Sequence, residues 1–420
     1  MARTADEWFP ILAKRLDDRR PAIEKDRKYA AGRGPVPEMG PNLRASWERF
    51  QRKAMRNLGG LAIASLCDRI VPNGCRVGQD DKSEASLRLR EAWRDNRLDV
   101  VFGDAINDYI ETGYGYLAVG LDDDGGAVLT RQRPEQFIAA TEPARPWKAR
   151  ASLNVWRDLD VELDFAVVTI AGHWKRWWRP ARADSGVWVK DAWPKGVSAR
   201  GGWLEHSEGE YEGGPLVAVL ERKGCKGLLN GHYDLIDGIN HGKLSRLVVT
   251  AMQAFRQRAI KQSAPKDGSL GSALPEKDAS GNDVDLGKVF EPAPGALWEL
   301  PEGFDIWESQ PTDIGPLLEG EKTDARDFAA ELRTPVSVFI PDSANQSAEG
   351  AAAAKESQVA QAHGEIKRLN PGIAVALVYL LQALRVDLAG QTVQVLWTPP
   401  EHVSMSEKYA AAAQAKAAGM

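Results

Sequence analysis

The sequence has few cysteines, and their arrangement excludes a disulfide framework. Cys67, Cys75 and Cys225 are the only three among 420 residues, and no two of them form a CxxC pair. An odd number of widely spaced cysteines is typical of a reducing compartment and not of a small secreted scaffold. We therefore expect free thiols.

Long hydrophobic runs are also missing. The longest apolar stretch, Ile373 to Leu381, is much shorter than the roughly 20 residues that a helix needs to cross a bilayer. Residues 1–7 contain no apolar core and no cleavage signature, so the sequence predicts neither a membrane span nor a secretory signal. We expect the chain to stay in the compartment where it is made.

No catalytic or metal-binding constellation can be assembled from the sequence. Residues 238–244 resemble part of a phosphate loop, but Asp237 stands where the first glycine belongs, and Leu244 stands where a serine or threonine would hold magnesium. The six histidines form no HExxH motif and no pair with cysteine at zinc-ligand spacing. We predict a structural or interaction protein that is not an enzyme and binds no metal and no cofactor.

The chain has no excess of basic residues. Its net charge is −5 and its pI is about 5.8, whereas proteins that grip DNA tightly neutralise phosphates with lysine and arginine. If the protein contacts DNA, we expect it not to bind the DNA tightly. The basic and aromatic run at residues 173–179 could stack on a single strand, but we favour alternation of rings and charges along a β-strand.

Two segments of opposite charge are the most informative feature that is present. Residues 231–262 carry apolar side chains at three- and four-residue spacing, and residues 312–334 do so more weakly before Pro335, so both segments predict helices. The first segment has no acidic residue after Ile239, and its basic residues are Lys243, Arg246, Arg256, Arg258 and Lys261. The second segment is mainly acidic through Asp313, Glu319, Glu321, Asp324, Asp327 and Glu331.

This charge pattern has two interpretations. A basic and an acidic helix can pack side by side within one chain or between neighbouring copies. The pair can equally be an ordinary antiparallel hairpin with solvated charges, because exposed ion pairs contribute only about 0–1 kcal/mol each. The hairpin alone leaves both interpretations open.

The rest of the chain predicts a mixture of helices and strands. Helical spacing covers residues 6–30, 42–70, 83–112, 347–386 (with a kink at Pro371) and 406–419. Strand patterns cover residues 114–119 with 127–129, 165–170, 173–179, 186–190, 215–220 and 392–397, and the runs 288–290 and 296–300 predict a small β element. These patterns indicate an α+β fold.

Several short signatures occur in a fixed order between residues 19 and 405. They are Arg19-Arg20-Pro21, Asp26-Arg27-Lys28-Tyr29, residues 93–99, Gly113-Tyr114-Gly115-Tyr116, Gly214–Val217, Asp237-Gly238-Ile239-Asn240, residues 255–260, Arg333-Thr334-Pro335 and residues 345–350. In this order the chain resembles the portal proteins of tailed bacteriophages, and among them the family similar to the portal of the Bacillus phage SPP1 and its actinophage relatives.

The resemblance implies a portal-like division of the chain. Residues 1–230 would hold N-terminal helices and an α/β wing, and residues 387–402 would add a wing strand. The two charged segments, 231–262 and 312–334, would be stem helices on either side of a clip at 263–311. A tunnel loop at 335–347 and a long tunnel-side helix at 348–386 would follow, and residues 403–420 would begin a crown that is short or incomplete.

The resemblance also implies partners and surfaces. The chain would form a ring of about twelve copies at one capsid vertex of a virion assembled in the host cytoplasm, with the terminase large subunit, the major capsid protein, a head–tail connector and a scaffolding protein as partners. Double-stranded DNA would pass through without sequence recognition during packaging and ejection. The side chains facing it would be Asn345, Gln346, Ser347 and Lys355, and the stem contacts between subunits would use Lys243, Arg246, Arg256, Arg258, Asp324, Asp327 and Glu331.

Two other function classes stay open at this point. A different ring-forming head–tail connector or capsid-associated protein would share the composition. A nucleotide-dependent motor subunit is disfavoured, because it would need the phosphate loop that residues 238–244 do not provide.

Overall fold

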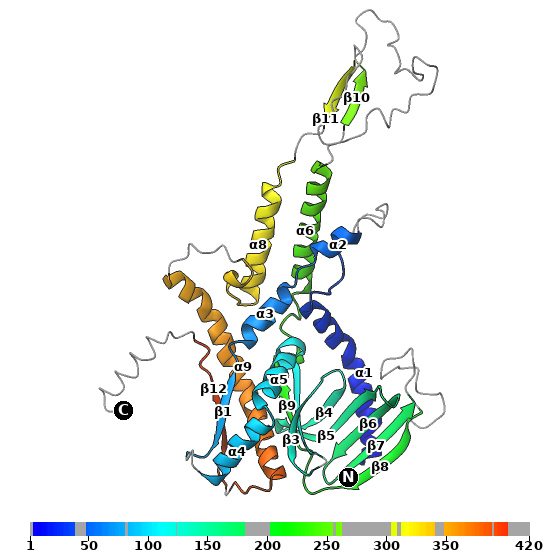
Figure 1. The fold of residues 1–420 in the computed structure, drawn as a ribbon, viewed down its shortest axis with the longest axis vertical. Coiled ribbons are helices and arrows are strands. Elements are labelled where there is room, and N and C mark those ends of the chain that lie inside the picture. The colour runs from blue at the N-terminus through cyan, green and yellow to red at the C-terminus, as the bar shows by residue number, and fades with distance from the viewer. Residues whose placement is uncertain are drawn as a thin grey trace, which may run out of the picture. The chain divides into compact units, whose positions relative to one another are not determined.

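In the computed structural model the chain forms two compact units. Figure 1 labels the helices and strands of both. The larger unit comprises residues 1–35, 55–237 and 325–420, and the smaller one comprises residues 36–54 and 238–324. The residues that the structure describes are 3–37, 48–79, 83–122, 124–180, 202–254, 258–262, 304–308, 312–340, 348–388 and 390–401. Within these ranges, no helix is long and apolar enough to cross a membrane.

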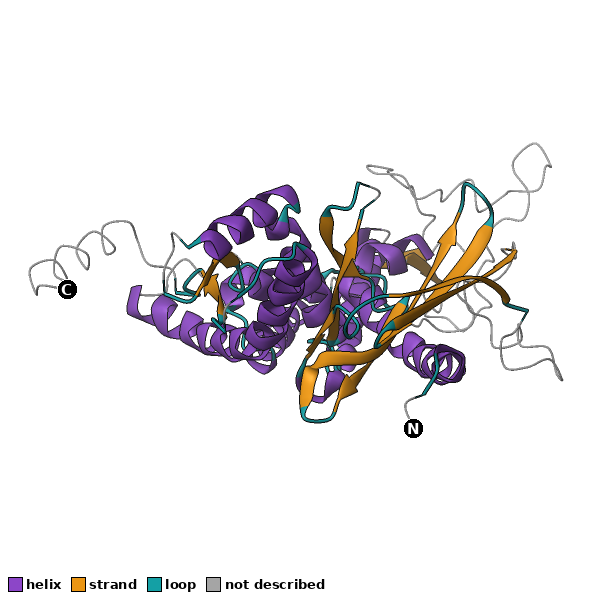
Figure 2. Ribbon diagram, turned by 90° about the horizontal axis from the view of Figure 1, so that it is seen from below, coloured by secondary structure: helices purple, strands orange, loops and turns teal. Residues whose placement is uncertain are grey.

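The larger unit contains an eight-stranded sheet with the order β3-β2-β9-β5-β6-β7-β8, to which β4 is added by pairing with β5. Figure 2 shows its strands side by side as one twisted layer, and each described pair is antiparallel. The strands are β2 (Tyr114–Leu121), β3 (Ala127–Gln132), β4 (Phe137–Glu142), β5 (Arg145–Asp158), β6 (Leu163–Ile170), β7 (His173–Pro180), β8 (Leu204–Glu210) and β9 (Val217–Glu221). The strand–turn–strand prediction around residues 120–126 is confirmed by β2 and β3, and the run 186–190 lies outside the described residues.

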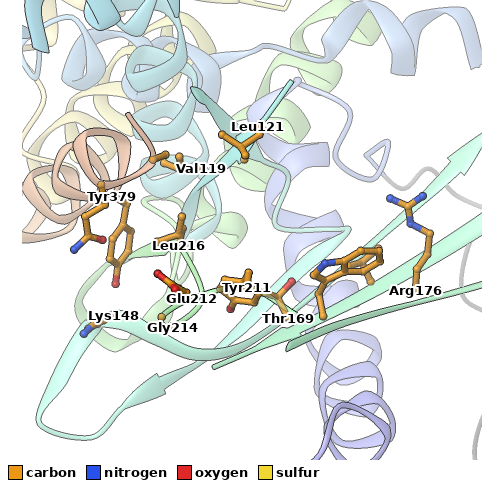
Figure 3. A pocket seen from close by; sticks show the side chains of 16 residues that line it. Val119, Leu121, Lys148, Thr169, Arg176, Tyr211, Glu212, Gly214, Leu216 and Tyr379 are labelled. Carbon is orange, nitrogen blue, oxygen red and sulfur yellow. The ribbon is translucent and has the colours of Figure 1, made fainter. Parts of the chain in front are cut away.

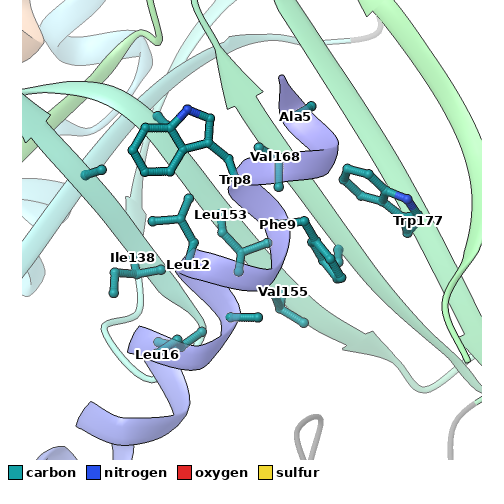
Figure 4. Close-up of a cluster of buried hydrophobic side chains, with 14 of the residues drawn as sticks. Ala5, Trp8, Phe9, Leu12, Leu16, Ile138, Leu153, Val155, Val168 and Trp177 are labelled. Carbon is teal, nitrogen blue, oxygen red and sulfur yellow. The ribbon is translucent and has the colours of Figure 1, made fainter. Parts of the chain in front are cut away.

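Helix α1 (Ala5–Ala30) covers one face of this sheet, as the helical spacing of residues 6–30 predicts (Figure 4). Thr4 and Glu7 form a capping box at its start, which satisfies backbone N–H groups that the first turn leaves without partners. Phe9 stacks on Trp177 of β7 with ring centroids 4.7 Å apart. The buried core between helix and sheet includes Trp8, Phe9, Leu12, Leu16, Ile138, Leu153, Val155, Val168 and Trp177.

Two segments that the periodicity predicts as single helices are each divided. Residues 42–70 contain α2 (Glu48–Ala54) and α3 (Leu58–Cys67), and the Asn57 side chain caps α3 by accepting a hydrogen bond from Gly60 N at 3.0 Å. Residues 83–112 contain α4 (Glu84–Asp95) and α5 (Leu98–Thr112), separated at Arg97, whose φ of 49° is left-handed. Apolar spacing continues across both breaks, so periodicity alone does not reveal them.

Helix α9 (Ala348–Ala383) is the third long helix and continues through Pro371. Gly372 lies against β9, because a Cβ at this position would be 2.4 Å from Leu220 Cδ2 and 2.9 Å from Val219 O. Glycine therefore lets the helix approach the sheet closely. The predicted last strand, β12 (Val393–Trp397), pairs antiparallel with β1 (Pro72–Val77) and so joins distant parts of the chain.

The charged segments form helices α6 (Tyr233–Ala254) and α8 (Gly315–Glu331). The first is shorter than predicted, because Arg258–Gln262 form strand β10, which pairs antiparallel with β11 (Phe304–Glu308) in the smaller unit. This conformation depends on hydrogen bonds to a strand more than forty residues away in the sequence. The side-chain pattern of residues 255–262 contains no information about that strand. The runs 288–290 and 296–300 and the final helix at 406–419 lie outside the described residues.

Candidate functional site

Arg27, one of the signature residues in α1, lies at the centre of a buried charged cluster. It donates hydrogen bonds to Asp108 at 2.5 Å, Glu111 at 2.6 Å and Glu135 at 2.6 Å, and Arg131 also binds Asp108. Burial by itself lowers the pKa of Arg27, but the three carboxylates outweigh it and raise that pKa above its usual value. The cluster fixes α1 against α5 and the connection between β3 and β4.

The neighbouring signature residues anchor the start of α6. Tyr233 donates a hydrogen bond to Asp26 at 2.5 Å, and Tyr29 donates one to Asp237 at 2.7 Å. The Lys25 ammonium lies 4.2 Å from the centre of the Tyr233 ring, which adds a cation–π contact. Burial raises the pKa of Asp26, although Tyr233 and nearby cations oppose that shift. The first turn of the candidate stem helix is therefore tied to α1 by side chains.

The signature at residues 113–116 has a steric explanation. Gly113 has a φ of +85°, and a Cβ there would lie 2.5 Å from Lys226 N, so only glycine fits. The Tyr116 hydroxyl accepts a hydrogen bond from Arg19 at 2.7 Å. The Arg19 guanidinium also lies 4.1 Å from the centre of the Tyr114 ring. These residues join α1 to β2, which supports the fold and does not present a surface to a partner.

The residues predicted to make stem contacts differ in whether they already have a partner in their own chain. Arg246 of α6 donates a hydrogen bond to Glu321 of α8 at 2.6 Å, and the two side chains are 20% and 8% exposed. This ion pair lies within the smaller unit, so Arg246 has a partner in its own chain. Lys243 is half-buried and also has an interaction partner. Opposite charges on the two helices thus meet inside one chain.

The remaining acidic stem residues lie at the surface. Asp324 and Asp327 are exposed and make no hydrogen bond or ion pair with any residue that the structure describes. Glu331 is exposed and accepts a hydrogen bond from the ring of His232 at 2.8 Å. Arg256 lies outside the described residues, and Arg258 is described only by its backbone in β10. The two free carboxylates are the ones available to a neighbouring molecule.

Helix α8 ends in a Schellman motif with an unusual residue. Arg333 has a φ of 55°, Thr334 N donates to Ala329 O at 2.9 Å, and Arg333 N donates to Ala330 O at 3.1 Å. Glycine is the common residue at this left-handed position. The motif places Pro335 and the 3₁₀ turn Val336–Val338 directly after the helix, where Phe339 packs on Phe328 with ring centroids 5.4 Å apart.

The predicted tunnel-facing residues are described only in part. Asn345, Gln346 and Ser347 lie outside the described residues, whereas Lys355 lies on α9 and is exposed. Further along α9, Glu365 accepts hydrogen bonds from Tyr109 at 2.6 Å and Arg222 at 3.0 Å. The helix is therefore firmly attached to the larger unit while its first turns present a lysine to solvent.

The run at residues 173–179 forms strand β7, as predicted. Lys175 pairs with Asp6 at 3.2 Å, and Arg179 pairs with Asp164 at 3.1 Å. Two of its three cations are thus bound by carboxylates of the same chain, which weakens the alternative that this run stacks on a nucleic acid.

Sequence reasoning did not identify the buried network around Arg27 and Asp26. One signal was present, since Asp108 and Glu111 lie three residues apart in α5 and so share a face. Their partners lie far away in the sequence, so no local pattern connects them.

Comparison with known proteins identified no matching family model and no matching curated protein. Solved structures are similar over almost the whole chain. The neck of a native gene transfer agent (GTA) particle with C12 symmetry is 14% identical, with a TM-score of 0.46 over 94% of this chain and 95% of that one. The virion of the native GTA particle gives 15% identity and a TM-score of 0.47, covering 94% of both chains.

A portal protein is also among the similar structures. The HK97-family phage portal protein from Corynebacterium diphtheriae is 10% identical, with a TM-score of 0.32 over 90% of this chain and 93% of that one. The closer likeness to the SPP1 portal stays a prediction.

Proposed function

We propose that the chain is the subunit of a ring-shaped portal through which double-stranded DNA enters and leaves a capsid. The order of elements carries this proposal: α6, the hairpin of β10 and β11, α8, a short turn after Pro335 and then α9. This is the order of stem, clip, stem, tunnel loop and tunnel-side helix that the resemblance implies. The antiparallel sheet with α1 would be the wing.

The surface chemistry of the helices supports a conduit. A wall that lets DNA slide should offer few basic groups, because each phosphate contact adds affinity and drag. The net charge of −5 is consistent with that requirement. Asn345, Gln346, Ser347 and Lys355 would line the bore as mainly neutral groups with a single cation per subunit.

Ring closure would use head-to-tail contacts, in which one surface of each subunit meets a different surface of the next. Because Arg246 is paired inside its own chain, we assign the contacts between subunits to Arg256 and Arg258 on one subunit, Arg258 being in β10, and Asp324 and Asp327 on the next. Lys243 and Glu331, which have partners in the chain, would contribute less. The attachment surfaces for the terminase large subunit, the major capsid protein, a scaffolding protein and a head–tail connector belong to the same proposal.

Electron microscopy of the purified full chain in negative stain tests the proposal directly. We expect closed rings of about twelve subunits with a central hole, and native mass spectrometry should give one dominant mass for the assembly. Particles without a hole, or monomers at every protein concentration and salt concentration tried, would refute a portal role.

A further inference from the structure

The larger unit contains a groove that no part of the proposed function uses. It has a volume of about 760 Å³ and is lined by β2, β5, β6, β7, the 211–216 connection and the end of α9 (Figure 3). Its apolar lining includes Val119, Leu121, Val167 and Leu216. Leu121 is 65% exposed, which is unusual for a leucine beside other apolar side chains.

Hydrogen-bond donors without partners lie among these apolar side chains. Tyr379 is only 6% exposed, and its hydroxyl makes no hydrogen bond to any described residue. Arg176 Nε, on the opposite side of the groove, is also buried without a partner among the described residues. Lys148 adds an ammonium group that lies 3.9 Å from Glu142. The buried Tyr379 hydroxyl and Arg176 Nε thus lack an acceptor among the described residues, which is uncommon for buried donors, whereas Lys148 pairs with Glu142.

The same chain has a surface of the complementary chemistry at the hairpin between β5 and β6. Leu159 is 80% exposed and Val161 is 55% exposed, and both project from a turn whose other residues are Asp158, Asp160 and Glu162. The Asp158 side chain accepts hydrogen bonds from the backbone of Asp160 at 3.0 Å and Val161 at 3.4 Å. The tip is therefore pre-organised, so its binding costs little conformational entropy.

The tip cannot reach the groove of its own chain. β5 and β6 form a continuous ladder from Asp158↔Leu163 to Ala151↔Ile170, and the groove begins at Val167 and Thr169. From Leu163 the strand extends about 13 Å to Val167 and about 20 Å to Thr169, at roughly 3.3 Å per residue. Since the two surfaces are held apart on one rigid sheet, only a second copy can bring them together.

We propose that the 158–162 tip of one subunit inserts into the groove of the next. Leu159 and Val161 would bury their side chains against Leu121, Val167 and Leu216. The carboxylates of Asp160 and Glu162 in the tip would face the cations Arg176 and Lys148, the second of which already pairs with Glu142 of its own chain. One carboxylate, Glu212, also lines the groove, but it is exposed at the rim and stays in water. This contact is heterologous, so repeating it generates a ring when the rotation between subunits closes. The inference therefore rests on the proposed ring and names a contact within it.

Removing the apolar tip tests the contact. The double variant Leu159→Ser with Val161→Ser should reduce the ring fraction in native mass spectrometry at least about tenfold, since the burial of two apolar side chains is lost. Its melting temperature as a monomer should stay unchanged, because both side chains are already exposed. The matched control is Leu87→Ser with Val100→Ser, which changes exposed residues on α4 and α5 that are 49% and 61% exposed, and it should leave the ring intact.

Cross-linking tests which surfaces meet. In a chain carrying Cys225→Ser, the pair Val161→Cys with Leu121→Cys should form disulfides between subunits and give a ladder of multimers on a non-reducing gel. Either cysteine alone should give no ladder. Pairing Val161→Cys with Val100→Cys should also give none.

The outcomes separate this inference from the portal proposal. Intact rings in the serine variant, together with no ladder from the cysteine pair, would overturn the inference and leave the portal proposal standing, with the groove open to a different protein. Absence of rings in the unmodified chain would overturn both. A ladder together with loss of rings in the serine variant would establish the contact.

Discussion

At the scale of single residues, the structure gives a physical role to signature positions that the sequence shows only as a pattern. Arg27 joins three carboxylates from two other parts of the larger unit, and Gly113 occupies a conformation that a side chain would block. Both residues hold α1, α5 and β2 together. Their effect on assembly would therefore act through the folding of the subunit.

Replacing Arg27 should be among the most destabilising single changes. Arg27→Met should lower the free energy of unfolding by about 3–5 kcal/mol, because it removes the cation from the buried Glu111 and the half-buried Glu135. The measurement is the melting temperature or the urea midpoint of the purified chain. Arg88→Ala is the control. Arg88 forms an ion pair with Glu91, and the two side chains are 60% and 53% exposed, so the pair should contribute less than about 1 kcal/mol to stability. Equal losses in the two variants would contradict the buried-cluster interpretation.

Glu221 should make stability depend on pH. Burial raises its pKa above the ordinary value of 4.5, while Arg19 opposes the shift only partly. A carboxyl group with a raised folded-state pKa destabilises the fold once the pH exceeds that pKa, and the penalty disappears below the unfolded-state value. Glu221→Gln should therefore raise the melting temperature at about pH 7 and have little effect at about pH 4.

The control for that experiment is Glu356→Gln, since Glu356 is an exposed glutamate on α9. It should change the melting temperature little at either pH. If Glu221→Gln raised the melting temperature equally at both pH values, the charge of the carboxylate would not be the cause of the stabilisation.

At the scale of elements, the packing of α9 depends on one glycine. Gly372 touches β9, whereas Gly364 of the same helix has no atom within 4 Å of an added Cβ. Gly372→Val should lower the free energy of unfolding by about 1–3 kcal/mol, because the added side chain overpacks the contact with β9. Gly364→Ala should raise it by about 0.5–1 kcal/mol, because alanine favours the helix more than glycine does. Thermal unfolding followed by circular dichroism measures both. A gain in both variants would mean that α9 does not pack on β9.

The elements also show how far a helix can be predicted. The periodicity of residues 6–30 and 348–383 agrees with α1 and α9, because each helix contains many turns with one apolar side. The breaks at Asn57 and Arg97 depend on a cap and on one left-handed residue. Such features change the backbone over one or two residues, which a pattern averaged over several turns does not resolve.

At the scale of the whole molecule, assembly of the proposed ring should depend on charges that the chain does not neutralise internally. Arg256→Glu with Arg258→Glu should reduce the ring fraction in native mass spectrometry, because like charges would then face each other between stems. Adding Asp324→Arg with Asp327→Arg should restore it. Arg88→Glu with Arg385→Glu is the control, since it changes the net charge equally at exposed positions elsewhere. Rings unaffected by the first pair of changes would contradict the proposed stem contacts.

The sequence by itself determined the α+β composition, the long helices, the strand–turn–strand at β2 and β3 and the separation of charge between α6 and α8. These features follow from side chains that are neighbours along the chain or recur at a regular spacing. Only the tertiary structure decided that residues 258–262 are a strand, that Arg246 pairs with Glu321, and that Arg27 and Asp26 are buried anchors. Each of these depends on a contact between residues more than forty positions apart, and their energies come from burial and partners that no local pattern contains.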